Sequence, residues 1–92
     1  MKSILQANER CHLCRNAVGT EWHHVFPGTP NRRHSEEDGL KVLLCSCCHW
    51  KVHNDPQESG KLMLDLKREA QEAYERTHTR EEFMNRYGRS WL

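Results

Sequence analysis

The amino-acid sequence predicts a small α+β domain in which two strands and a helix form a ββα unit, followed by C-terminal helices. The chain has 92 residues, enough for one domain with a limited hydrophobic core. Two C-x-x-C pairs offer ligands for a stabilising metal ion, and short apolar runs give way to helix-forming residues after Pro56. We therefore expect one zinc-stabilised domain over residues 1–92, with a zinc knuckle segment at 1–20, the ββα core at 21–56 and helices at 57–92.

The first half of the chain predicts the ββα unit. The segments "TEWHHVF" (20–26) and "LKVLLC" (40–45) are rich in apolar, β-branched and aromatic residues, which is typical of strands. Between them, "PGTPNRRHSEEDG" (27–39) is full of Pro, Gly, Asn, Ser and charged residues, and we interpret it as a loop. "SCCHWKVHND" (46–55) predicts a helix that ends near Asn54 and Asp55.

The second half predicts two helices. "SGKLMLDLKREAQEAYERTH" (59–78) has an apolar face with spacings of four, four and three, formed by Leu62, Leu66, Ala70 and Ala73. Thr79 and Glu82 then form a capping box for a short helix. That helix carries Phe83, Met84 and Tyr87 and ends at Gly88, and we expect Trp91 and Leu92 to pack on the core.

The cysteines favour a zinc site over disulfides. The chain has five, an odd number, and thiols stay reduced in a cytosol. Cys11 and Cys14 form one pair, and Cys45 and Cys48 form another that begins 31 residues after Cys14. Four such thiolates can close a tetrahedral structural zinc site, whereas core packing alone does not require paired spacing. Cys47 remains as a buried or free thiol.

Four histidines predict a second metal site. His49 and His53 are four residues apart, so they share a helix face, although a solvated face is the alternative for such a pair alone. His49 points about 100° away from Cys48 and should therefore serve a different ion. The adjacent residues His23 and His24 lie in a predicted strand, where neighbouring side chains point to opposite sides. One imidazole can therefore complete the ion's shell while the other acts as a base. We expect His12, His34 and His78 to be solvated.

The charge and composition limit which nucleic-acid and membrane partners the protein can have. A net charge of +1 is not that of a strongly basic nucleic-acid binder, so any affinity for DNA should come from a local patch. No apolar run approaches the roughly 20 residues that span a bilayer, and the start resembles no secretory signal. We expect a cytoplasmic protein with no membrane partner, and the sequence leaves the oligomeric state open.

The stretch "CHLC…EWHHVFPGTPNRRHSEEDGLKVLLCSCCHWKVH" resembles the HNH endonucleases with their ββα-metal fold, and especially small phage-type members with a zinc-binding pair on each side of the motif. It covers just under half of the chain. The resemblance implies that His23, His49 and His53 hold a catalytic divalent ion and that His24 is the general base. Glu21 is similar to an acidic residue that organises the site in colicin-type members. The motif's central asparagine is missing from its place before the second strand, where Asp38 stands. Either Asp38 or Asn31 substitutes for it, or the activity is weak or lost while the fold survives.

The implied activity is metal-dependent hydrolysis of DNA phosphodiester bonds, leaving a 5′-phosphate. Zn²⁺ would be the structural ion, and Mg²⁺, Mn²⁺, Ni²⁺ or Zn²⁺ the catalytic one. Arg32 and Arg33 either bind phosphate or form an exposed basic loop, and Trp50 either packs in the core, which we favour, or faces DNA. Two alternatives remain: an inactive zinc-stabilised DNA-binding or recombination-accessory module, and a structural zinc protein that binds other proteins.

Overall fold

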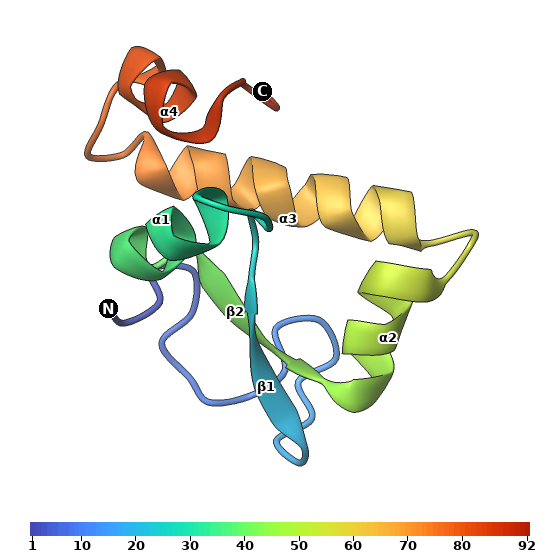
Figure 1. Cartoon of the computed structure of the whole chain (residues 1–92). Coiled ribbons are helices and arrows are strands. Elements are labelled where there is room, and N and C mark those ends of the chain that lie inside the picture. Colours follow the sequence, from blue (N-terminus) through green and yellow to red (C-terminus); the bar gives the residue numbers. More distant parts are fainter.

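The computed structural model describes all 92 residues and contains two strands and four helices (Figure 1). In chain order these are β1 (Thr20–His24), α1 (Asn31–Asp38), β2 (Lys41–Cys45), α2 (Ser46–Asn54), α3 (Ser59–Tyr74) and α4 (Arg80–Tyr87). The α+β fold class is therefore confirmed. None of the helices combines the length and apolar character that crossing a membrane requires.

The two strands form an antiparallel sheet in which His23 lies opposite Val42 and His24 lies opposite Lys41. All of β2 is buried, whereas β1 buries only His23 and exposes Glu21 and Trp22. The other edge of β2 is bordered by the N-terminal segment. There the Leu43 amide donates to the Gln6 side chain over 2.8 Å, and the His12 amide donates to the Leu43 carbonyl over 2.7 Å.

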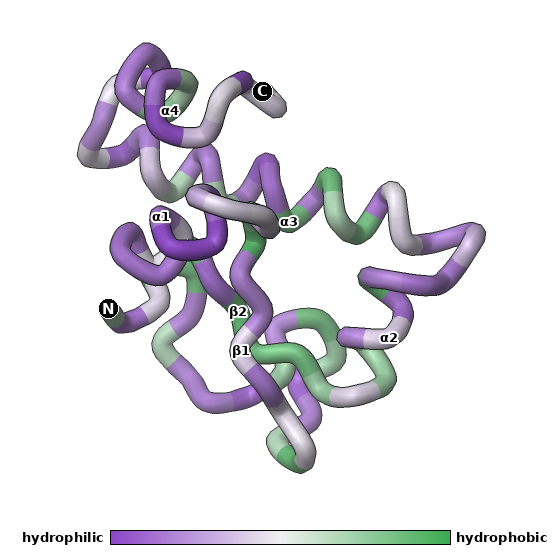
Figure 2. The backbone as a smooth tube through the Cα atoms, viewed as in Figure 1, coloured by the Kyte–Doolittle hydropathy of each residue, from purple (hydrophilic) through white to green (hydrophobic).

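The predicted loop at 27–39 is wrong over residues 31–38, which form helix α1. Figure 2 shows α1 as hydrophilic, so no apolar repeat signals it in the sequence. A single buried serine fixes it instead: the Ser35 hydroxyl donates to the Phe26 carbonyl and accepts from the Phe26 amide, both over 3.3 Å. Gly39 ends the helix in a left-handed conformation with φ 72°, where a β-carbon would collide with the Lys2 carbonyl oxygen.

The C-terminal helices follow the predicted pattern. Leu66, Ala70 and Ala73 are buried on one face of α3, and Leu62 packs against the same core. The Thr79–Glu82 capping box is present, and Gly88 ends α4 in a left-handed conformation. Phe83, Tyr87 and Trp91 join the core, but Leu92 is 43% exposed, so its predicted packing is wrong.

Candidate metal centres and the adjoining pocket

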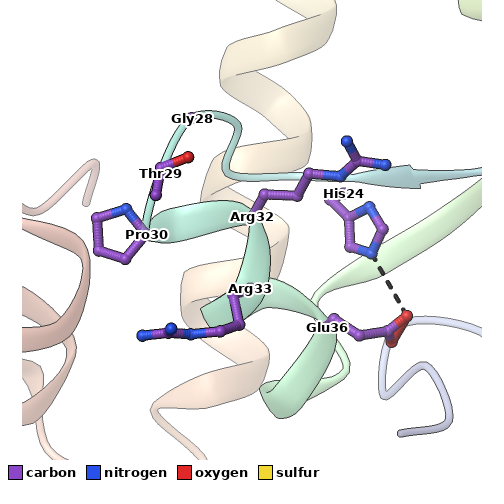
Figure 3. A pocket seen from close by; sticks show the side chains of 7 residues that line it. All are labelled: His24, Gly28, Thr29, Pro30, Arg32, Arg33 and Glu36. Carbon is purple, nitrogen blue, oxygen red and sulfur yellow. Dashed lines mark ion pairs between the residues drawn. The ribbon is translucent and has the colours of Figure 1, made fainter.

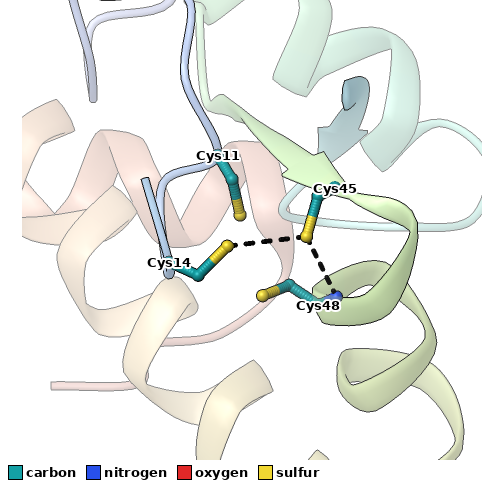
Figure 4. Close-up of side chains that lie close together, drawn as sticks. All are labelled: Cys11, Cys14, Cys45 and Cys48. Carbon is teal, nitrogen blue, oxygen red and sulfur yellow. Dashed lines mark hydrogen bonds between the residues drawn. The ribbon is translucent and has the colours of Figure 1, made fainter. Parts of the chain in front are cut away.

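The four paired cysteines lie together although they come from three parts of the chain. Cys11 and Cys14 lie in a turn of the N-terminal segment, Cys45 ends β2, and Cys48 lies in the first turn of α2. Figure 4 shows the four sulfurs pointing toward a common centre. Their sulfur atoms all lie within 4.8 Å of one another, and Cys14 Sγ is 3.6 Å from Cys45 Sγ. Two sulfur atoms that bind the same tetrahedral zinc ion lie about 3.8 Å apart, so the spacing of these four sulfurs fits a zinc ion.

The backbone prepares this cluster for a metal. The Cys11 amide donates to the Asn16 carbonyl over 2.7 Å, and the Cys11 carbonyl accepts from Arg15, whose φ of 71° closes the turn. Burial raises the pKa of Cys11, but hydrogen bonds from the backbone of Cys14, Cys45 and Leu13 outweigh it and lower the pKa to about 6. A thiolate, the form that binds zinc, is therefore available near neutral pH.

Two residues near this cluster lie outside it. Cys47 is exposed and does not belong to the group of four sulfurs. His12 was expected at the surface, but its side chain is only 14% exposed and its Nε2 lies 2.8 Å from Glu69 Oε2 on α3. This contact ties the cysteine turn to the long helix.

Three of the predicted ligand histidines also lie together. Each of these residues offers one ring nitrogen, and the three nitrogens of His23, His49 and His53 all lie within 4.8 Å of one another. The ring centroids are 5.5 Å apart for His23 and His49, 5.2 Å for His23 and His53, and 4.8 Å for His49 and His53. His49 and His53 share a face of α2, and β1 brings His23 to that face. The neighbours Cys48 and His49 therefore contribute to two different clusters, as expected.

The surroundings of His23 keep it neutral. The residue is 7% exposed, and burial together with the charges of His53, His49 and His24 lowers its pKa to about 4. A neutral imidazole is the form that binds a metal ion. Glu21, the predicted organising acid, places its Oε2 3.8 Å from His49 Nδ1 at the edge of this cluster.

His24 points away from the cluster into a neighbouring pocket of about 390 Å³ (Figure 3). Its lining contains four ionisable side chains beside glycine, threonine and proline, and consists of His24, Gly28, Thr29, Pro30, Arg32, Arg33 and Glu36. A second hollow of about 220 Å³ is lined by Trp22, His23, His24, Pro27, Arg32 and His53. His24 and Arg32 belong to both hollows and therefore connect the pocket to the histidine cluster.

Glu36 is a site residue that the sequence analysis missed. Its Oε1 lies 3.5 Å from His24 Nε2, and its other oxygen binds the Lys41 ammonium. The hydrogen bond from Lys41 lowers the pKa of Glu36, so the carboxylate stays charged beside His24. Had residues 31–38 been read as a helix, the spacings of three and four from Arg33 and Arg32 to Glu36 would have placed all three on one face.

Of the other predicted site residues on α1, only Arg32 extends toward the histidines. Figure 3 shows Arg32 extending toward His24 and Arg33 extending the opposite way. Asn31 begins α1 and is absent from the pocket lining. Asp38 lies at the far end of α1, where it accepts from Tyr87 Oη over 2.6 Å and binds Arg86. The structure therefore does not bring Asp38 to the histidines.

Of the two exposed tryptophans, Trp50 departs from expectation and Trp22 lies beside the site. Trp50, which we expected in the core, is 57% exposed on α2. Trp22 is 45% exposed on β1, where it lines the hollow beside His23 and His24. Strand alternation turns Trp22 and His24 toward the same side of β1.

Comparison of the chain with protein-family profiles, curated proteins and solved structures gives no match.

Proposed function

We propose that this protein is a metal-dependent DNA endonuclease of the HNH type, with β1, β2 and α2 as its ββα-metal unit. The observation that carries the proposal is the cluster of His23, His49 and His53 directly beside a fourth imidazole, His24, that the cluster does not use. A purely structural role would require no free imidazole next to three gathered ones. The proposal also accounts for the separate cysteine cluster, which stabilises the scaffold.

The donor set of the histidine cluster fits a divalent transition ion. Three imidazole nitrogens suit Zn²⁺ or Ni²⁺ better than Mg²⁺ or Mn²⁺, which prefer oxygen ligands. His49 is half-buried and His53 is exposed, so substrate and solvent can reach this side of the cluster. When bound, the divalent ion supplies Lewis-acid stabilisation of the charge that develops on a phosphodiester during hydrolysis.

His24 is placed to accept a proton from water. Its Nε2 is buried without a hydrogen-bond partner, and the Glu36 carboxylate lies 3.5 Å away, so we assign the ring proton to Nε2 and leave Nδ1 as the acceptor. A water held beside Nδ1 becomes the nucleophile as its proton passes to the ring. This division between His24 and Glu36 supplies the base without placing a second charge among the three ligand histidines.

Arg32 is placed to hold the substrate phosphate. It lines both hollows, so its guanidinium can reach a phosphate that lies between His24 and the histidine cluster. In-line attack from the His24 side then breaks the bond to the 3′-oxygen and leaves a 5′-phosphate. Arg33 extends away from His24, so its role is limited to contact with a neighbouring phosphate of the DNA backbone.

A plasmid cleavage assay tests the proposal. Zinc-loaded protein is incubated with supercoiled DNA and Mg²⁺, Mn²⁺, Ni²⁺ or added Zn²⁺, and nicked or linear products are expected with at least one ion. Because a general base contributes typically 10²- to 10⁴-fold, His24→Ala should lower the rate by about that factor. His78→Ala removes an exposed histidine outside both clusters and should leave the rate unchanged.

Failure to cleave DNA with any of the four ions would refute the nuclease. DNA binding without cleavage would then favour the inactive zinc-stabilised binding module. The zinc content and the melting temperature of each variant should match the wild type, so that a loss of rate reports chemistry and not unfolding.

A further inference from the structure

We propose that Trp22 is a stacking platform for an unpaired nucleobase and that the substrate is single-stranded or locally unpaired DNA. This inference rests on the proposed nuclease function and specifies its substrate class. It starts from an observation that the catalytic arrangement does not explain: a large aromatic side chain remains 45% exposed on the strand that carries His23 and His24.

The Trp22 ring is held in place before any substrate arrives. The Lys41 ammonium lies 4.9 Å from the ring centroid, and Lys41 is itself 8% exposed and bound to Glu36. A cation over a ring attracts the ring and covers one side of it, which restricts the orientations that the ring samples. A ring that is already ordered loses little conformational entropy when a base stacks on it.

The position of Trp22 matches the reach of a nucleotide. Trp22 and His24 are two residues apart on β1 and face the same side, so their α-carbons are about 7 Å apart along the strand. Trp22 also borders the hollow that contains His23, His53 and Arg32. A phosphate held at Arg32 beside His24 therefore places an adjoining base over Trp22.

The stacking argues for unpaired DNA. The face of a base is covered by its neighbours within a duplex, and it becomes available to an aromatic side chain only when the strand is unpaired or the base is extruded. With a net charge of +1, the protein gains little affinity from the phosphate backbone of a duplex. An aromatic contact at the site would then supply a large share of the binding.

Fluorescence anisotropy with a labelled oligonucleotide of roughly 12 nucleotides, and with the duplex of the same sequence, tests the inference. The full zinc-loaded chain carries His24→Ala so that the DNA stays intact. We expect tighter binding of the single strand than of the duplex. Trp22→Leu should weaken single-strand binding by roughly 5- to 100-fold and leave duplex binding unchanged, and Trp22→Phe should retain most of the affinity.

Trp50→Leu is the matched control, because Trp50 is 57% exposed but lines none of the hollows. It should leave both affinities unchanged. The inference is overturned if the single strand does not bind, if Trp22→Leu has no effect or weakens duplex binding equally, or if Trp50→Leu has the same effect as Trp22→Leu.

The cleavage assay separates this inference from the proposed function. Cleavage by the wild type without a Trp22-dependent preference for single strands would refute the stacking site and keep the nuclease. Trp22-dependent binding of single strands without cleavage by the wild type with any ion would refute the nuclease and keep the stacking site.

Discussion

His23 and His24 are neighbours in sequence but occupy different environments. The side chain of His23 is buried among two other imidazoles, whereas His24 lines a polar pocket with Glu36 and Arg32. Strand geometry alone causes this separation, because successive side chains point to opposite faces. Adjacent identical residues can therefore be a ligand and a base without competing for one position.

Glu36 should affect catalysis through His24. In Glu36→Gln the amide no longer stabilises the ring as a carboxylate does, so we expect kcat to fall by roughly 10- to 100-fold with little change in KM. The measurement is steady-state cleavage of a fluorogenic oligonucleotide. Nitrogen-15 NMR should also show that the wild-type His24 ring carries its proton on Nε2 and that Glu36→Gln mixes the two tautomers.

Glu37→Gln is the control for this prediction, because Glu37 lies next to Glu36 on α1 but pairs with Arg86. An equal loss of kcat in Glu37→Gln, or an unchanged tautomer ratio in Glu36→Gln, would assign Glu36 a structural role only.

The buried His23 should make folding stability sensitive to mild acid. Its pKa is lowered from 6.5 to about 4 in the folded protein, so the unfolded chain binds a proton at a higher pH than the folded one. The free energy of unfolding should therefore be highest above pH 6.5 and should fall as the pH drops toward 4, by up to about 3 kcal/mol in total.

Urea unfolding of zinc-loaded protein without a second divalent ion measures this effect. Between pH 6.5 and 5.5 the wild type should lose about 1 kcal/mol more than His23→Gln. Parallel pH profiles for the two proteins would contradict the assignment.

At the scale of the elements, α1 depends on contacts from outside the helix. Ser35 fixes it to Phe26, and Asp38 at its end binds Tyr87 and Arg86 of α4. These contacts position the helix that carries Arg32 and Glu36. The C-terminal helix therefore supports the pocket although none of its residues lines it.

Tyr87→Phe tests this support. Tyr87 is 3% exposed, and the change removes its hydrogen bond to the Asp38 carboxylate, so we expect a loss of about 1.5–3 kcal/mol in the free energy of unfolding. Tyr74→Phe provides the comparison, because Tyr74 is also buried but its hydroxyl has no hydrogen-bond partner in the protein. A similar loss in both variants would show that the hydrogen bond is not the cause.

The elements that the sequence predicted well have a local signal. The apolar face of α3, the capping box of α4 and the strand segments are all visible in short windows. The helix α1 has no such signal, because its stability comes from partners outside the helix: Ser35 binds Phe26, and Asp38 binds Tyr87 far along the chain. The same long-range contacts explain why Glu36 could not be placed beside His24 from the sequence, whereas His49 and His53 could be paired from their spacing.

At the scale of the whole molecule, the cysteine cluster joins the N-terminal turn to the end of β2 and the start of α2. A structural zinc ion contributes about 10–16 kcal/mol in zinc-finger peptides, comparable to the entire stability of about 5–15 kcal/mol of an ordinary domain. Cys11→Ser should therefore lose the zinc ion and the cooperative unfolding transition. Metal analysis and circular dichroism measure both.

Cys47→Ser is the matched control, because Cys47 is exposed and outside the cluster. It should keep one tightly held zinc ion per chain and a normal transition. Retention of zinc by Cys11→Ser, or its loss in Cys47→Ser, would contradict the ligand assignment.

The helix α2 holds Cys48 on one side and His49 and His53 on the other. A zinc ion on the four sulfurs would anchor the first turn of this helix and so fix the direction in which the two imidazoles point. Under the proposed nuclease function, loading would then be sequential, with the ion of the cysteine cluster arriving before the ion of the histidine cluster. A cell short of zinc would in that case hold the chain as an inactive precursor.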